Sequence, residues 1–264
     1  MTIVVASVVG VVMPRAADFD HDYGQYAKVL HDHVHATRVD YTALKSGRAL
    51  LDEAVAALAE PAADDERQWT REQRLAFWIN AYNTFTLRVI VDHYPIQSPW
   101  YTLSPRNSIR QIDGVWTTIT WRAAGRTLTL DDIEHRILRP EFKDPRVHFA
   151  VNCASAGCPA LAPEPYRAVT LDAQLDAAAR RYLARDEGLR IDGKTVRVSK
   201  ILQWYGEDFV ARFAPDAIDK PDRVEQAIRG VVARFGPPAA VDLARAPSTR
   251  IRFLDYDWSL NDVR

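Results

Sequence analysis

One cysteine stands where a nucleophile is expected. Cys153 lies in the segment His148-Phe-Ala-Val-Asn-Cys-Ala-Ser-Ala-Gly-Cys-Pro159. Alternation before it predicts a strand over residues 147–151, so the thiol should follow a strand end. The small residues after it, around Ser155, should leave the sulfur accessible and present backbone N–H groups to a thiolate or an oxyanion. The segment therefore predicts a nucleophilic cysteine, and the alternative is a small thiol buried in the core.

The second cysteine allows a different chemistry. Cys158 follows Cys153 by five residues, and the chain has no other cysteine. This spacing is neither the C-x-x-C of redox motifs nor a zinc-binding knuckle. In an oxidising compartment the two thiols can form a disulfide, which would mask Cys153. Cys158 is therefore a possible redox partner.

A short predicted helix carries a carboxylate and an imidazole. Apolar spacing predicts a helix over residues 131–138, ended by Pro140. Glu134 falls among the apolar residues of this helix, where a carboxylate needs a partner. His135 lies at the edge of the apolar face and can act as a base or pair with a thiolate. The alternative is a structural histidine in a buried polar network.

Two asparagines and a further histidine are candidate orienting or substrate-binding groups. Asn80 and Asn83 lie three residues apart in a long helix predicted over residues 71–93. A buried amide must find hydrogen bonds, either to substrate or catalytic histidine, or to the backbone of a neighbouring loop. His148 is the first residue of the cysteine segment and is a further candidate of this kind.

Neither a metal site nor a cofactor is expected. His31, His33 and His35 alternate in the sequence, which would align them on a strand. The residues before them follow a helical pattern, and on a helix the three side chains diverge.

The composition indicates a globular protein that does not bind nucleic acid. The 264 residues are 47% hydrophobic, and the formal net charge is −1 with both signs mixed along the chain. The apolar run from Ile3 to Met13 predicts a signal peptide over residues 1–17. The rest, residues 18–264, should form one domain without a membrane span, periplasmic or secreted. Its partner would be a small-molecule or peptide-like substrate.

The remaining pattern predicts an α+β fold that is mostly helical, with a small antiparallel sheet and β-hairpins. Beyond the elements above, the expected helices begin near Tyr23, Leu50, Leu171 and Ile201. Residues 64–67 read as a polar connection. Hairpins are expected within residues 115–130 and 189–198, the second with an Asp192-Gly193 type I′ turn.

Several segments together resemble a known family. Four ordered motifs carry the likeness, and the ending looks like the tail of exported bacterial members: Phe77-Trp-Ile-Asn-Ala-Tyr-Asn83, Ile133-Glu-His-Arg-Ile-Leu-Arg139, His148-Phe-Ala-Val-Asn-Cys153, Leu202-Gln-Trp-Tyr-Gly-Glu-Asp-Phe209 and Phe253-Leu-Asp-Tyr-Asp-Trp-Ser-Leu-Asn261. Over residues 19–261 the chain resembles the domain of unknown function 547 family.

The resemblance implies a site but no assigned activity. The family's polar signature falls on Asn80, Asn83, Glu134, His135 and Cys153. Some members look fused to glutaredoxin-like modules, which points to thiol chemistry. The second cysteine matches bacterial members, whereas plant members often carry serine there, and this favours the first cysteine over an obligatory disulfide.

Three functions follow as hypotheses. The first is a cysteine-dependent hydrolase or acyl transferase with Cys153 as nucleophile, His135 as base and Glu134 or an asparagine orienting the base. The second is a thiol redox protein that uses Cys153 and Cys158. The third is a non-catalytic binding or structural domain, in which the polar residues only fix the fold.

Overall fold

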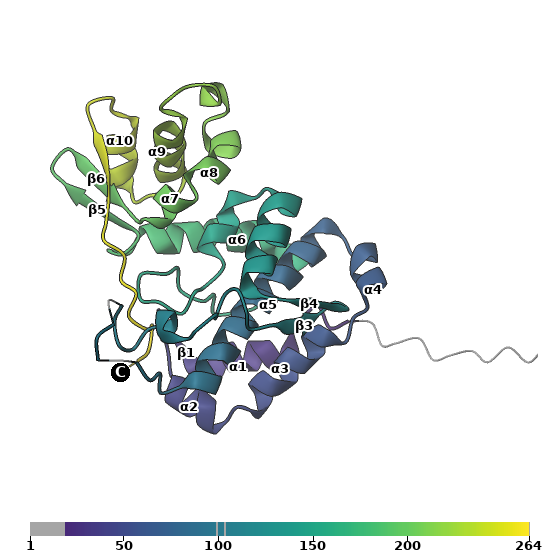
Figure 1. The fold of residues 1–264 in the computed structure, drawn as a ribbon. Coiled ribbons are helices and arrows are strands. Elements are labelled where there is room, and N and C mark those ends of the chain that lie inside the picture. Colours follow the sequence, from purple (N-terminus) through teal and green to yellow (C-terminus); the bar gives the residue numbers. More distant parts are fainter. Residues whose placement is uncertain (1–18, 99, 103, 264) are drawn as a thin grey trace, which may run out of the picture.

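The computed structural model describes residues 19–263 except 99 and 103 (Figure 1). The predicted signal peptide lies outside these residues. Most of the described chain is helical. The α-helices are α1 (Gly24–His33), α2 (Tyr41–Ser46), α3 (Ala49–Ala59), α4 (Ala63–Gln68), α5 (Arg71–His93), α6 (Leu171–Leu183), α7 (Ile201–Trp204), α8 (Gly206–Phe213), α9 (Arg223–Phe235) and α10 (Pro238–Arg245).

Helical segments of other kinds connect them. There is a π-helix, η2 (Asp132–Phe142), and there are 3₁₀ turns η1 (Ile109–Gln111), η3 (Pro145–Phe149), η4 (Ala168–Thr170) and η5 (Pro215–Ala217). The strands are β1 (Val34–His35), β2 (Arg38–Val39), β3 (Trp121–Ala123), β4 (Arg126–Leu128), β5 (Leu189–Asp192), β6 (Thr195–Val198) and β7 (Arg250–Phe253).

The sheets are small, and the expected fold class is confirmed. β1 pairs with β2, β3 with β4 and β5 with β6, all antiparallel. β7 adds to β6 in parallel, so the three-stranded sheet is mixed. The Asp192↔Thr195 pair places the hairpin turn at Gly193-Lys194, one residue later than predicted. Positive φ occurs at Gly193 but not at Lys194, as in a type II′ turn.

The strand predicted over residues 147–151 is wrong. This stretch begins with the 3₁₀ turn η3, which Asp144 caps by accepting a hydrogen bond from the Arg146 N–H. The same Asp144 carboxylate also binds the Arg146 side chain. These local hydrogen bonds favour a turn over an extended chain, so Cys153 does not follow a strand.

Two helix boundaries also differ from the prediction. Residues 64–67, expected as a connection, form most of α4. The helix with Glu134 and His135 does not end at Pro140 but continues to Phe142 as a π-helix. Because a π-helix bonds residue i to i+5, the missing proline N–H removes only the bond that would reach the His135 carbonyl.

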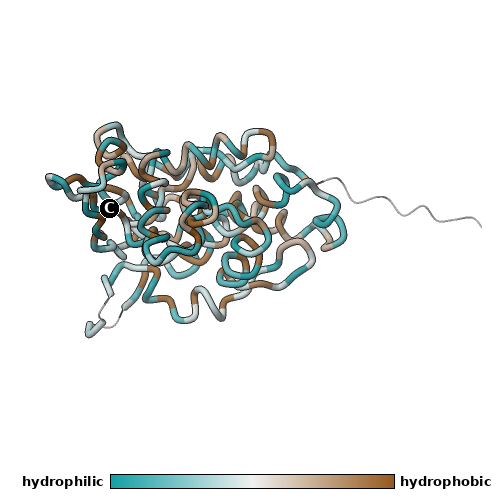
Figure 2. Tube along the Cα trace, turned by 90° about the horizontal axis from the view of Figure 1, so that it is seen from above, coloured by the Kyte–Doolittle hydropathy of each residue, from teal (hydrophilic) through white to brown (hydrophobic). Residues whose placement is uncertain are grey.

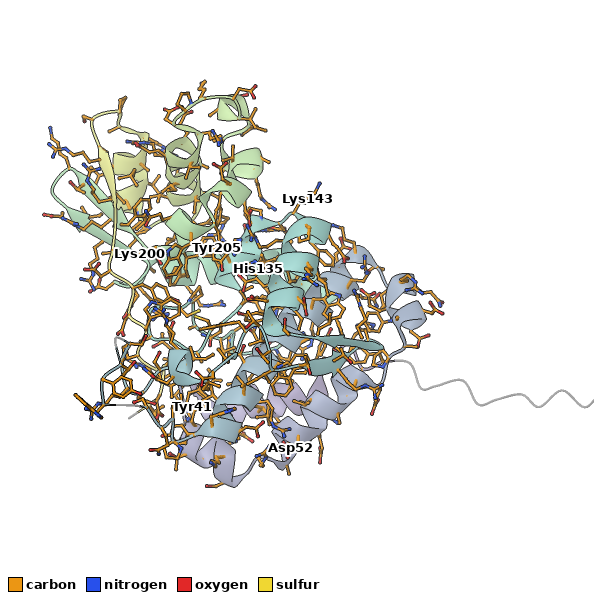
Figure 3. All side chains as sticks on the ribbon, in the orientation of Figure 1. Tyr41, Asp52, His135, Lys143, Lys200 and Tyr205 are labelled. Atoms are coloured by element: carbon orange, nitrogen blue, oxygen red, sulfur yellow. The ribbon has the colours of Figure 1, made fainter. Side chains whose placement is uncertain are left out.

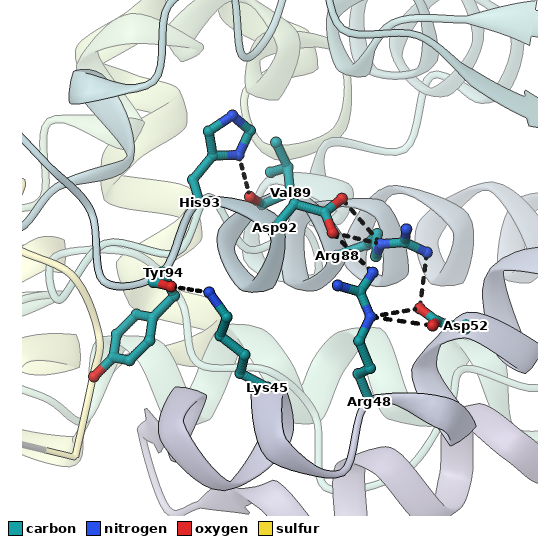
Figure 4. A network of polar contacts seen from close by, with 8 residues as sticks. All are labelled: Lys45, Arg48, Asp52, Arg88, Val89, Asp92, His93 and Tyr94. Atoms are coloured by element: carbon teal, nitrogen blue, oxygen red, sulfur yellow. Dashed lines mark hydrogen bonds and ion pairs between the residues drawn. The ribbon is translucent and has the colours of Figure 1, made fainter.

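The long helix α5 has the predicted bounds and lies at the centre of the first of two hydrophobic cores. Thr70 and Gln73 form a reciprocal capping box at its start. Nearly all its side chains from Leu75 to Val91 are buried. α5 also joins α3 on the outside, where Arg48 and Arg88 bind Asp52 and Asp92 (Figure 4). These partly exposed pairs add little stability individually.

The described chain has two hydrophobic cores. The first is built around α5 and the second around β5, β6, α8 and α9. α6 belongs to both, because Leu171 and Leu175 pack in the first core and Tyr182 and Leu183 in the second. Apolar and hydrophilic residues interchange along the helices, which suits elements with one buried face (Figure 2).

The C-terminal segment ties the two cores together. After β7 the chain returns to the first core (Figure 1). There Leu260 forms a β-bridge with Ser155, and Asp262 forms one with Val39. Gly157 is held close beneath it, since a Cβ at this glycine would lie 2.9 Å from the Asp257 nitrogen. A side chain there would push the segment away. In the described part of the chain no helix is long and apolar enough to cross a bilayer.

Candidate functional site

A cavity of about 490 Å³ opens between the two cores. Side chains from both cores surround it, and most are aromatic or ionisable. They are Tyr82, Trp116, Asp131, Glu134, His135, Arg139, His148, Val151, Cys153, Cys158, Ile201, Trp204, Tyr205, Tyr256 and Trp258. Figure 3 shows His135 and Tyr205 close together where the two cores meet.

Asparagines hold the loop that carries the thiol. Asn83 of α5 donates to the Ala150 carbonyl and accepts from the Asn152 N–H, at 3.0 and 2.8 Å. Asn152 in turn donates to the Pro159 carbonyl and accepts from the Ala154 N–H. Ala154 has a left-handed φ of 57°. These bonds fix the turn that directs Cys153 into the cavity.

Three side-chain groups surround the half-buried Cys153 sulfur. Its Sγ lies 3.0 Å from Cys158 Sγ, 3.2 Å from Ser155 Oγ and 3.3 Å from Tyr256 Oη. The Ser155 hydroxyl also donates to the Tyr256 hydroxyl, at 3.0 Å. Both cysteines are free thiols. The sulfur therefore lies in a cluster of hydrogen-bond donors, which is an environment that stabilises a thiolate.

The contacts shift the two thiols in opposite directions. The hydrogen bond between the two sulfurs, together with those that Cys153 forms with Ser155 and Tyr256, outweighs burial and lowers the pKa of Cys153 to about 7. Burial and the neighbouring Cys153 charge raise the pKa of Cys158 well above its ordinary value. Cys153 is therefore the thiol that ionises first, and Cys158 is its proton-bearing neighbour.

Most backbone amides after Cys153 already have acceptors. Ala156 donates to the Ser259 carbonyl, Gly157 to the Asp257 carbonyl and Cys158 to the Ser155 carbonyl. Ala154 donates to Asn152. The oxyanion donors expected from this loop are thereby reduced to the Ser155 amide, which hydrogen-bonds the Cys153 sulfur, and the nearby hydroxyls.

Glu134 and His135 reach the cavity from η2 but have separate partners. His135 Nδ1 lies 2.9 Å from an Arg139 N–H and its Nε2 3.7 Å from Asp131. Because arginine only donates, Nδ1 is an acceptor and a neutral ring carries its proton on Nε2. Glu134 is buried, and together with burial its contact with the Tyr205 hydroxyl raises the pKa of Tyr205. Within the described residues, neither side chain hydrogen-bonds Cys153.

His148 supports the cavity wall. Its Nε2 lies 2.8 Å from Asp208, and its ring stacks on Tyr205 with centroids 3.9 Å apart. Asp208 also receives two hydrogen bonds from Arg139, at 2.6 and 2.9 Å. Burial alone raises the pKa of Asp208, but His148 and Arg139 outweigh it and lower the pKa far below its usual range. This network fixes Tyr205 beside Glu134.

The structure divides the predicted residues into two groups. Cys153, Cys158, Glu134, His135 and His148 line one cavity, and Ser155 contacts the thiol. The asparagines brace backbone instead. Asn83 holds the thiol loop, and Asn80 binds both the N–H and the carbonyl of Tyr166, at 2.9 and 2.8 Å.

Several cavity residues were not predicted from the sequence. Tyr205 and Trp204 lie within the fourth motif quoted above, and Tyr256 and Trp258 within the C-terminal motif. Those motifs were a signal that their aromatic residues have a role, but they did not show that these residues meet Cys153.

His31, His33 and His35 form no common site. His31 and His33 lie on α1 and His35 on β1. Over the described residues, no group of three or more His, Cys, Asp or Glu side chains is arranged to hold a metal ion.

Fold and cavity together define a mostly helical α+β protein with a low-pKa thiol at the boundary of two cores. Residues 66–183 match the family described as protein of unknown function, DUF547, which supports the resemblance found in the sequence. The match includes α5, η2, the thiol loop and α6, whereas Tyr205 and Tyr256 lie beyond it. Comparisons with curated proteins and with solved structures gave no match.

Proposed function

We propose that the protein is a cysteine-dependent hydrolase or acyl transferase. The observation that carries this proposal is the Cys153 sulfur, which faces a substrate-sized cavity and has a pKa of about 7. Such a thiol is substantially ionised near neutral pH, and the thiolate is the nucleophilic form. A peptide-like amide or ester is the expected substrate class, and export to the periplasm or the exterior is part of the proposal.

The proposed reaction has two steps. The Cys153 thiolate attacks the substrate carbonyl carbon, the bond to the leaving group breaks, and a thioester forms. The leaving group departs with the electron pair of the broken bond and takes a proton from solvent. The Ser155 amide and the Tyr256 hydroxyl are the donors nearest to the developing oxyanion. Water, or an acceptor amine or alcohol, then attacks the thioester and releases Cys153. His135 takes the proton of that attacking group after its ring leaves Arg139.

Hydrolysis of p-nitrophenyl acetate tests this proposal. Wild-type protein should release a burst of about one p-nitrophenolate per chain, and mass spectrometry of peptides should find the acetyl group on Cys153. Cys153→Ala should lose the burst. His135→Ala should keep it but slow steady turnover by roughly 100-fold, the typical contribution of a general base.

A histidine outside the cavity provides the matched control. His31 is 86% exposed on α1, outside the cavity, and pairs with Asp32, so His31→Ala should leave both phases unchanged. Acetylation at lysines without a burst would count against the nucleophile. A burst with normal turnover in His135→Ala would remove the base from the mechanism and retain Cys153.

The distance between the two sulfurs favours a second candidate, a thiol redox protein. Cys153 Sγ and Cys158 Sγ are 3.0 Å apart, and the two pKa values are shifted in opposite directions. In this reaction the Cys153 thiolate attacks an external disulfide, one thiol leaves, and a mixed disulfide forms. Cys158 then loses its proton and attacks Cys153 Sγ, releasing the second external thiol. Two electrons pass from the protein to the external disulfide.

Oxidised glutathione distinguishes this candidate. In the redox reaction wild-type protein should become an internal disulfide without a lasting adduct, as measured by intact mass before and after reduction. Cys158→Ser should instead accumulate glutathione on Cys153, because the resolving thiol is gone. Equal adduct levels in both proteins would exclude a resolving role for Cys158.

A further inference from the structure

The buried carboxylate of the cavity lies near one cation, Arg139, which is already paired with Asp208. Glu134 is 6% exposed and lines the cavity, and in the described part of the chain it forms no ion pair. Its contact is the Tyr205 hydroxyl. The other charged side chains of the cavity are paired, Arg139 with Asp208 and Asp131 with His135. A buried carboxylate without an ion-pair partner is unfavourable unless a ligand supplies one.

Aromatic rings form a wall of the same cavity. Tyr256 and Trp258 have centroids 4.6 Å apart, Trp204 lies 4.9 Å from Tyr256, and Trp116 lies 6.4 Å from Trp258. Trp204 is 46% exposed although it is a large apolar side chain. Exposed aromatic faces attract cations and stack on planar or apolar groups.

Cations of the protein already use these rings. The Arg110 guanidinium lies 4.9 Å above the Trp258 ring, and that of Arg139 lies 5.2 Å above Tyr205. Neither arginine pairs with Glu134. The wall therefore suits positive groups, while the carboxylate that would complete such a site is unpaired.

We propose that the cavity binds a protonated amine of the substrate, with Glu134 as the counter-charge and the aromatic wall around the adjoining apolar group. This rests on the proposed function and narrows its substrate class to acyl compounds that carry an ammonium group near the carbonyl, such as an amino-terminal residue of a peptide. Glu134 is then a specificity-determining residue, not an orienting group for His135.

The proposal is tested by calorimetric titration with two matched probes, 2-phenylethylammonium and the neutral 2-phenylethanol. Wild-type protein should bind the ammonium at least about tenfold more tightly, since a charge-assisted contact in a buried site is worth this much or more. Glu134→Gln keeps the size of the side chain and an acceptor for Tyr205, and should bind both probes equally. Glu141→Gln removes a carboxylate from the same helix outside the cavity and should retain the preference.

Trp204→Leu provides a second variant at an exposed position. It should weaken the binding of both probes. The difference in affinity between the two probes should remain, because Glu134 is still present. Equal affinities in wild-type protein, or a preference that persists in Glu134→Gln, would overturn the proposal. Neither probe reacts with a thiol, so the binding result can be interpreted even if Cys153 does not acylate. The two proposals can therefore fail separately.

Discussion

Replacing Arg146 with methionine should lower the free energy of unfolding by about 3–5 kcal/mol, because it removes the buried cation that joins Asp144 to Asp176. The Arg146 side chain is 5% exposed and binds Asp144 and Asp176 at 2.7 Å each. Arg212 also reaches Asp144. These pairs connect η3 of the thiol loop to α6 and α8. Urea denaturation followed by circular dichroism measures the change.

A second arginine on the same carboxylate gives the control. Arg180 pairs with Asp176 at 3.5 Å but is 50% exposed, so Arg180→Met should change stability by about 1 kcal/mol or less. Equal losses in the two variants would show that burial of the Arg146 cluster does not matter.

The loss in Arg146→Met should also depend on pH. Burial raises the pKa of Asp144, but hydrogen bonds from Arg146 and the charges of Arg146 and Arg212 outweigh it and hold the pKa below its usual value. The unfolded carboxyl titrates near pH 3.9. The stabilising contribution of Asp144 is therefore fully present above about pH 4 and is lost as the pH falls through the folded pKa. The difference between wild type and variant should shrink below about pH 4.

Removing the Cys158 thiol should sharply reduce the reactivity of Cys153 in mild acid. Iodoacetamide labelling of wild-type Cys153 should rise with pH through an inflection near 7, the pKa that its neighbours set. In Cys158→Ala the largest lowering contact is lost while burial persists. The inflection should then approach or exceed about 8.5, the value of a free cysteine. Labelling at pH 6, measured by peptide mass spectrometry, should fall roughly tenfold or more.

A conservative variant separates the hydrogen bond from the effect of volume. Cys158→Ser keeps a donor beside Cys153, so its inflection should lie between those of wild type and Cys158→Ala. His135→Ala should leave the inflection near 7, because the contacts that lower the pKa come from Cys158, Ser155 and Tyr256. An unchanged profile in Cys158→Ala would show that the sulfur contact does not stabilise the thiolate.

Local sequence determined the helical framework of this protein. α5 and α6 have the bounds that their apolar periodicity predicts, since an amphipathic pattern acts over a few residues, and α5 also has its own capping box. The same local information identified Cys153, Cys158, Glu134 and His135 as chemically notable residues. It failed over residues 147–151, where apolar alternation suggested a strand but the Asp144 cap and the Arg146 ion pairs stabilise a turn.

Only the tertiary structure decided what surrounds the thiol. Tyr256 lies 103 residues after Cys153, and the pairing of the C-terminal segment with the thiol loop brings the two together. Glu134 and His135 are adjacent in sequence, yet the packing of η2 places Glu134 next to Tyr205 and His135 next to Arg139. Hydrogen bonds, burial and pKa shifts depend on which distant side chains are in contact. These contacts are determined by the packing of the folded chain. Thus the sequence selected Cys153, whereas the return of the C-terminal segment placed the hydroxyl of Tyr256 beside it.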